Sequence, residues 1–119
     1  MGYQRHHAIV VTSYRWDLID TAYREAVALG MTVTSIVISP MNLVYSFFVA
    51  PDGSQESWTR SKHGDEQRTA FKKWLDQQRF EDGSTPLNWA EVQYGDTDGK
   101  TCVVAHSDEP IREKPGCLP

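Results

Sequence analysis

The sequence predicts an α+β protein in which two helices pack on one face of a mostly antiparallel, five-stranded sheet. Five short segments rich in β-branched and aromatic residues alternate with two segments of helical periodicity, in the order β-α-β-β-α-β-β. The second and third strands are separated only by a short turn at 40–42, which favours an antiparallel hairpin. The length of 119 residues predicts a single domain over 1–119.

The first half of the chain supplies three of the strands and the first helix. Residues 7–13, HAIVVTS, form a near-continuous apolar run, which predicts a central strand buried on both faces. Residues 18–29 place apolar side chains at helical spacing, and Gly30 suits the left-handed position after a helix. The segments 31–39 and 43–50 predict the two strands of the hairpin.

The second half supplies the other helix and the last two strands. Residues 54–64 are predicted as a polar connection, and Asp65 as the cap of a helix that runs to about Arg79. The predicted buried stripe of this helix consists of Ala70, Phe71, Trp74 and Leu75. Strands are predicted over 88–94 and 101–106, followed by an irregular tail over 107–119. In the strand 88–94 the alternation sets Ala90, Val92 and Tyr94 against Trp89, Glu91 and Gln93, as expected for a half-exposed strand.

Charge and composition limit the classes of partner. A formal net charge of −4 argues against binding to a nucleic acid polymer, which needs clustered cations. No segment approaches the roughly 20 apolar residues that cross a bilayer, so no membrane association is expected. Cys102 and Cys117 form no C-x-x-C pair, which predicts reduced thiols and a cytoplasmic location.

No arrangement of residues predicts catalysis. His7 and His106 do not stand in the paired H-x-T/S motifs of two-histidine phosphodiesterases, and His63 lies in no recognisable set of metal ligands. A G-x-S-x-G nucleophile motif and a glycine-rich phosphate loop are also missing from the sequence. We therefore expect a non-enzymatic protein without a metal or cofactor; an enzyme acting through one of the three histidines is the alternative.

Aromatic and cationic side chains pair at two places that suit ligand binding. Tyr14-Arg15-Trp16 stands where the central strand leads into the first helix, and the free N–H groups of a helix N-terminus can bind an anion. An aromatic ring and an arginine at this position could stack a base and hold a phosphate. Packing of Trp16 on the first helical turn is the alternative. Trp58 and Arg60 repeat the pairing inside the polar connection.

Phe80 and Asn88 could extend an aromatic wall beside these pairs, with a place for Phe80 in the core as the alternative. The candidate ligand-binding residues are Arg15, Trp16, Trp58, Arg60, Phe80 and Asn88.

The stretch from Tyr45 onward contains the segments SFFVAPDGS, GDEQR, FKKWL, EDGS, WAEVQYGD and VVAHSD. With these segments, about half of the chain resembles the Thoeris anti-defence sponge family of phages and prophages. Members of that family capture cyclic ADP-ribose signals made by bacterial TIR-domain enzymes, without degrading them. The resemblance implies an α+β fold in paired subunits, with hexamers in some members.

The resemblance also implies roles for individual residues. Phe80 or Trp16 would stack the adenine, Arg60 or Arg15 would meet the pyrophosphate, and Asn88 would line the pocket. Arg24 would serve a second anionic site between subunits. Pairing of Arg24 with Asp20, four residues earlier on the same helix, is the alternative.

Two functions follow as expectations. The first is a phage or prophage counter-defence protein, a homo-oligomer in the host bacterial cytoplasm, that sequesters a cyclic ADP-ribose isomer. The second is an acidic inhibitor of the anti-defence or immunity type that blocks a basic bacterial protein. Its acidic face would consist of Asp96, Asp98, Asp108, Glu109 and Glu113.

Overall fold

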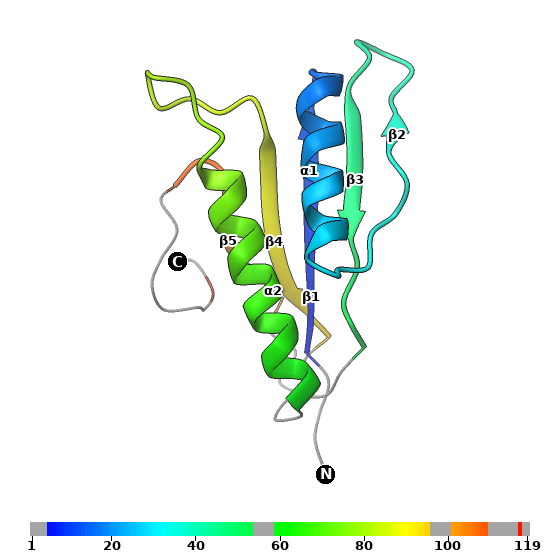
Figure 1. Ribbon diagram of the computed structural model, residues 1–119, viewed down its shortest axis with the longest axis vertical. Helices are drawn as coiled ribbons and strands as arrows, with labels where there is room; N and C mark the ends of the chain where they lie inside the picture. The colour runs from blue at the N-terminus through cyan, green and yellow to red at the C-terminus, as the bar shows by residue number, and fades with distance from the viewer. Residues whose placement is uncertain (1–4, 54–58, 96–100, 110–116, 118–119) are drawn as a thin grey trace.

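Five antiparallel strands form one sheet, and both helices lie on the same face of it (Figure 1). The computed structural model describes residues 5–53, 59–95, 101–109 and 117. The elements are β1 (His6–Ser13), α1 (Trp16–Ala28), β2 (Val37–Ile38), β3 (Tyr45–Val49), α2 (Thr59–Asp76), β4 (Asn88–Tyr94) and β5 (Cys102–His106). This arrangement confirms the predicted α+β class and element order.

The strands lie side by side in the order β2-β3-β1-β4-β5. The first six elements therefore have the split β-α-β topology of ferredoxin-like domains, and β5 extends the sheet beyond β4. β1 is central, as its apolar sequence predicts, and Ile9 and Val11 are fully buried beneath the helices. Val10, however, is 46% exposed on the opposite face. The prediction of a strand buried on both faces is wrong because the helices cover only one face.

α1 presents its predicted apolar stripe to the sheet. Ile19, Ala22 and Ala26 are fully buried, and Gly30 takes a left-handed φ of 80° just beyond the helix. Phe71 and Leu75 of α2 complete the core beside them. None of the helices within the described residues has the length and apolar character to cross a membrane.

α2 begins at Thr59, well before the cap predicted at Asp65. Asp65 lies inside the helix, where it pairs with Arg68 one turn later. Gly64, inside the helix, is buried against the side chain of Asp52, and a Cβ at this position would collide with that carboxylate. The absent side chain thus lets the helix continue along the end of β3. Ala70 of the predicted stripe is exposed, whereas Lys72 is buried.

β2 is much shorter than the strand predicted over 31–39. The chain does follow β3 from residue 32 onward, since Ala50 N donates to Thr32 O at 2.9 Å and Thr34 N donates to Phe48 O at 2.9 Å. Phe48 N, however, donates to the hydroxyl of Thr34 at 3.0 Å. A side chain therefore takes the place of a backbone carbonyl in the ladder and interrupts the strand.

β4 has the predicted bounds. The set Ala90, Val92 and Tyr94, which is the more apolar of its two faces, does not face the core. Trp89, Glu91 and Gln93 are buried, whereas Ala90, Val92 and Tyr94 are half-buried on the uncovered face. The register explains this result, because Glu91 lies opposite Ile9 and Trp89 lies opposite Val11, both on the helix-covered face. The buried face of this strand is therefore partly polar.

Cys102 and Cys117 are joined in a disulfide, so the prediction of reduced thiols is wrong. At Cys117 the chain has come back beside Cys102 at the start of β5. The Cα atoms of the two cysteines lie 5.4 Å apart, a separation that a disulfide spans. Sequence spacing alone could not reveal this return. The described part of the tail, residues 107–109 and 117, contains no helix or strand.

A buried hydroxyl connects β1 to the segment between α2 and β4. Ser13 is 1% exposed, its hydroxyl donates to Pro86 O at 2.7 Å, and it accepts a hydrogen bond from Arg15 N at 3.1 Å. The same side chain thus positions both the start of α1 and the approach to β4.

We expect Ser13→Ala to lower the free energy of unfolding by about 1–3 kcal/mol, because it leaves buried polar partners unsatisfied. Urea denaturation at pH 7 measures this loss. Ser35→Ala, at an exposed position, is the matched control and should change stability by less than about 0.5 kcal/mol. Equal effects of the two substitutions would contradict the role of the Ser13 hydroxyl.

Candidate functional site

The predicted ligand-binding residues divide between the two ends of the sheet. We call the end formed by 13–16, 77–88 and 106–109 the loop end; there β1 leads into α1, α2 leads into β4, and β5 finishes. Arg15, Trp16, Phe80 and Asn88 belong to it. Arg60 lies in the first turn of α2, at the opposite end, because the start of α2 packs beside Asp52 after β3. Trp58 falls outside the described residues.

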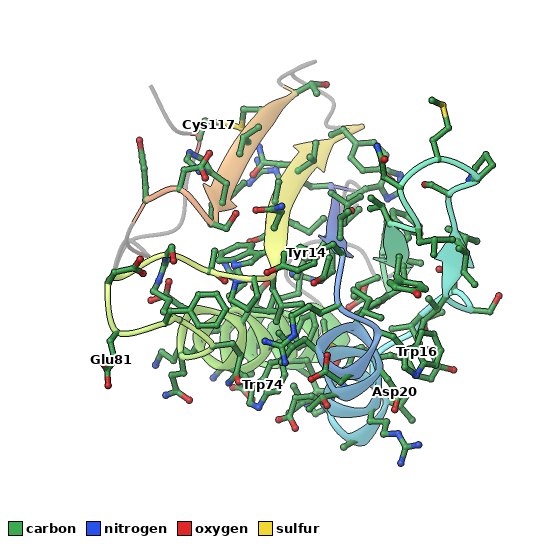
Figure 2. All side chains as sticks on the ribbon, turned by 90° about the horizontal axis from the view of Figure 1, so that it is seen from above. Tyr14, Trp16, Asp20, Trp74, Glu81 and Cys117 are labelled. Atoms are coloured by element: carbon green, nitrogen blue, oxygen red, sulfur yellow. A yellow bond between two sulfur atoms is a disulfide. The ribbon has the colours of Figure 1, made fainter. Side chains whose placement is uncertain are left out.

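The two candidate aromatic side chains at the loop end are both accessible. Trp16 is 49% exposed and meets Tyr45 edge-on, with ring centroids 5.4 Å apart, so it packs on β3 while keeping a free surface. Phe80 is 46% exposed and does not belong to the core, contrary to the alternative of a core side chain. In the view from above, Trp16 lies beside α1, and Glu81, which follows Phe80, lies at the far side of α2 (Figure 2).

The candidate arginines of α1 are paired with acids on the same helix. Arg15 contacts Asp17 through two hydrogen bonds of 3.2 and 2.7 Å, and the stronger of these holds the pKa of Asp17 below its ordinary value of 3.8. Arg24 Nε lies 3.0 Å from Asp20 Oδ2, which is the alternative expected for it. An anion at either arginine would have to compete with a carboxylate.

A shallow hollow of about 340 Å³ opens at the loop end on the uncovered face of the sheet. Its floor contains Val10, Thr12 and Ala90 of the two central strands, and Asn88 and His106 stand on neighbouring strands beside it. The remaining lining residues are Trp89, Ser107 and Asp108. Of the predicted ligand-binding residues whose side chains the structure describes, only Asn88 lines this hollow. Sequence analysis missed the others because the cross-strand register brings them together.

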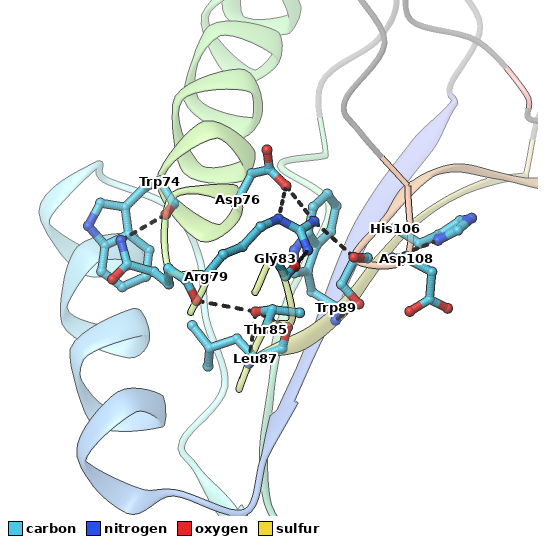
Figure 3. Close-up of polar contacts among 11 residues, drawn as sticks. Trp74, Asp76, Arg79, Gly83, Thr85, Leu87, Trp89, His106 and Asp108 are labelled. Atoms are coloured by element: carbon cyan, nitrogen blue, oxygen red, sulfur yellow. Dashed lines mark hydrogen bonds and ion pairs between the residues drawn. The ribbon is translucent and has the colours of Figure 1, made fainter. Parts of the chain in front are cut away.

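The segments around the hollow are fixed by a single arginine that sequence analysis did not single out. Arg79 donates to Asp76 Oδ1 at 2.7 Å, to Gly83 O at 2.9 Å and to Ser107 O at 2.9 Å (Figure 3). These contacts connect the end of α2, the following turn and the end of β5. Ser107 in turn pairs with the backbone of Trp89, through Ser107 N to Trp89 O at 3.0 Å. The loop end is therefore a preformed surface.

A second group of polar side chains lies beneath α2, and we call it the Glu91 cluster: Glu91, Lys72, Arg68 and His7. The Glu91 side chain is only 3% exposed. Lys72 Nζ lies 2.5 Å from Oε1, but this close approach is not aligned as a hydrogen bond. His7 Nδ1 donates to Oε2 at 3.0 Å, and Arg68 Nε lies 3.6 Å from the same oxygen. Lys72 and Arg68 come from one face of α2, and Glu91 comes from β4 beneath that helix.

Burial by itself would raise the pKa of Glu91, but the hydrogen bond from His7 and the charge of Lys72 outweigh it. The pKa of Glu91 therefore lies below its ordinary value of 4.5, and the carboxylate is ionised at neutral pH. A carboxylate with a lowered pKa is a weak general base. The adjoining cleft, lined in part by Gln67 and Arg68, has room for about one water molecule, at about 10 Å³.

The histidines are dispersed over the fold. His7 belongs to the Glu91 cluster, His106 lines the hollow, and His63 is exposed on α2. His106 Nδ1 accepts a hydrogen bond from Asp108 N at 3.1 Å. Within the described ranges, no group of three or more His, Cys, Asp or Glu side chains gathers as metal ligands would.

We expect Glu91→Gln to lower the free energy of unfolding by about 3 kcal/mol at pH 7, because buried cations lose their counter-charge. Urea denaturation measures this, with exposed Glu81→Gln as a near-neutral control. Because the folded pKa lies below 4.5, the stabilisation is complete above about that pH and disappears as the pH falls through the folded pKa. The gap between wild type and variant should therefore narrow on acidification. A gap that stays constant from pH 7 to pH 3 would contradict the assignment.

Compared with known proteins, the chain matches no family model, no curated protein and no solved structure.

Proposed function

We propose that this protein is a non-enzymatic binding protein that captures a small nucleotide-type ligand at the loop end. The observation that carries the proposal is the preformed hollow of about 340 Å³ beside Asn88. Small-molecule sites occupy about 300–1,000 Å³ and combine apolar walls with a few polar groups. A hollow of this size can hold one nucleoside, so the remainder of a larger ligand would extend beyond it.

The chemistry of the lining favours a base or a ribose over a phosphate. Val10 and Ala90 offer an apolar floor, and the amide of Asn88 can both donate and accept hydrogen bonds. Among the described residues, the lining of the hollow includes no lysine or arginine, and Asp108 lies at its border. Phosphates of a bound ligand would therefore point away from the floor. The resemblance to the Thoeris sponge family supports a cyclic ADP-ribose isomer as the ligand.

Two observations support capture without turnover. The three histidines of the described residues that were weighed as catalytic lie apart, and the Glu91 cluster has room beside it for only about one water molecule. The lowered pKa of Glu91 also makes it a poor proton acceptor at neutral pH. At the hollow itself, His106 Nδ1 accepts a hydrogen bond from Asp108 N at 3.1 Å, and the Ser107 hydroxyl accepts one from Trp89 N at 3.2 Å, so both side chains already have backbone partners.

We place this function in the bacterial cytoplasm, in a phage or prophage protein that acts as a homo-oligomer. A reducing cytoplasm would open the Cys102–Cys117 disulfide. Cys102 begins β5, whereas His106 at the hollow ends it. Ligand binding is therefore expected to be the same with and without a reductant.

The second candidate function is inhibition of a basic protein partner. Asp108 and Glu109 are exposed next to each other at the loop end, which favours this function. Asp96, Asp98 and Glu113 of the expected acidic face lie outside the described residues. Binding of this kind would weaken steeply as the salt concentration rises.

Thermal melting against a panel of cyclic nucleotides and cyclic ADP-ribose isomers tests the first function. A ligand at a hundredfold excess over its dissociation constant adds about 2.7 kcal/mol, which raises the melting temperature by several degrees. The ligand should be recovered unchanged after denaturation. A panel without any shift, or a ligand recovered as product, would contradict the proposal.

Ala90→Phe should fill the hollow and weaken binding at least about tenfold, while the fold tolerates an aromatic residue at this half-buried strand position. Titration calorimetry with the compound that gives the largest shift measures this effect. Ala28→Phe makes the same change on the exposed side of α1 and should leave the affinity unaltered. Equal affinity of both variants would place the ligand elsewhere.

A further inference from the structure

The strand β2 forms one edge of the sheet, and the chain around it carries no charge. Among the strands of the described residues, β2 has only β3 beside it (Figure 1). From Met31 to Pro51 the sequence contains no Asp, Glu, Lys, Arg or His, although 24% of the chain is charged. Natural edge strands often carry charged side chains, which discourage pairing with another chain. This edge lacks that protection.

The backbone of β2 has hydrogen-bonding groups that point away from β3. In an antiparallel pair, successive residues alternate between bonding to the partner strand and facing away from it. Ser39 N donates to Val44 O at 2.8 Å, and in the same register Ile38 lies opposite Tyr45. Because Ser39 bonds to the chain of β3, the N–H and C=O of its neighbour Ile38 point outward. They offer one donor and one acceptor to a further strand.

The side chains of β2 are apolar and exposed on both faces of the sheet. Val37 is 59% exposed, and Ile38, which points to the other face, is 58% exposed. Ile38 lies opposite Tyr45, and the ring of Tyr45 meets Trp16 of α1 edge-on. Figure 2 shows Trp16 on the side of α1 that is turned toward β2. Trp16, which lines no part of the hollow, thus extends the apolar surface of this edge.

The turn after β2 adds two exposed apolar side chains, Met41 and Leu43. Leu43 has a φ of 49°, in the left-handed region that costs a residue with a Cβ free energy. Since its side chain is exposed, packing within the described part of the chain does not offset this cost. Backbone strain of this kind is concentrated at binding and switch sites. We call Trp16, Val37, Ile38, Met41 and Leu43 the edge patch.

We propose that the edge patch binds a short extended segment of a partner protein, which joins the sheet as a strand beside β2. The outward N–H and C=O of Ile38 call for the backbone of a strand, which a lipid surface does not supply. Apolar side chains on both faces call for apolar residues on both sides of that segment, and the neutral stretch from Met31 to Pro51 favours a segment without charge. Main-chain hydrogen bonds give such a complex its affinity, and side-chain contacts give it specificity.

The dimensions of the edge favour a free segment over a second copy of this chain. β2 is only two residues long, so two β2 edges would share very little pairing. A free segment can follow the edge and also reach Trp16 and the turn at Met41. The other edge strand, β5, has Cys117 bonded beside its first residue. The β2 edge is therefore the better docking place among the described strands.

Binding of a labelled peptide to the full chain tests the proposal. The probe is an uncharged peptide in which valine alternates with threonine, made soluble by a polyethylene glycol tail, and fluorescence polarisation measures its dissociation constant. Ile38→Lys should weaken binding at least about tenfold, because it places a charge at the apolar edge. Val27→Lys makes a matched change at an exposed position of α1 and should bind like the wild type. Circular dichroism establishes that both variants are folded.

A second peptide separates strand pairing from apolar contact. The same sequence with all its amides N-methylated keeps its side chains but has no backbone donors, and it should bind at least about tenfold more weakly. Three results would overturn the proposal: no binding of the unmodified peptide at millimolar concentration, equal binding of the two peptides, or wild-type affinity of the Ile38→Lys protein.

Sedimentation velocity without peptide, and flotation with phosphatidylcholine vesicles, test the other occupants of the edge patch. Ile38→Lys should leave both results as they are for the wild type. A wild-type dimer that this substitution dissociates would assign the patch to a second copy, and vesicle binding that it abolishes would assign the patch to lipid; either would overturn the proposal. The edge patch shares no residue with the lining of the hollow. Nucleotide capture should therefore be the same in Ile38→Lys and the wild type, and either proposal can fail without the other.

Discussion

The ionised carboxylate of Glu91 beneath α2 is the interaction on which the arrangement of helix and sheet depends. A buried charge is tolerated only when partners replace its hydration. Lys72 and Arg68, one turn apart on α2, and His7 on β1 supply those partners within 4 Å. The helix is thereby held at one position along β4. The apolar contacts of Phe71 and Leu75 supply the adjoining part of the same interface.

This cluster determines which face of the sheet is charged. Because Glu91 and Gln93 lie on the helix-covered face, Ala90 and Val92, which alternate with them, lie on the opposite face. The hollow beside Asn88 opens on that face. The same alternation thus links a stabilising ion cluster inside the sheet to a binding surface outside it.

Much of the fold could be predicted from the local sequence pattern. Where the prediction was wrong, the reason is physical. The bounds of β4 were predicted correctly, but not its orientation, since alternation defines which residues share a face and not which face is covered. Glu91 can be buried because Lys72 of α2 lies against it across the interface between helix and sheet. The sequence around Glu91 does not reveal this partner. Asp65 was mistaken for a helix cap because residues 54–64 are polar and were predicted as a connection, whereas α2 begins at Thr59. At the loop end, Arg15, Trp16, Phe80 and Asn88 were identified, but Arg79 and the floor of the hollow depend on long-range pairing.

The most direct test of this account is the titration of Glu91 itself. An NMR titration of the protein carrying a ¹³C label at the glutamate carboxyl groups, assigned with the Glu91→Gln variant, gives the pKa of this residue in the folded state. The account predicts a midpoint below 4.5, because His7 and Lys72 together outweigh the effect of burial. A midpoint above 4.5 would mean that burial dominates and that the ion cluster does not hold α2 to the sheet.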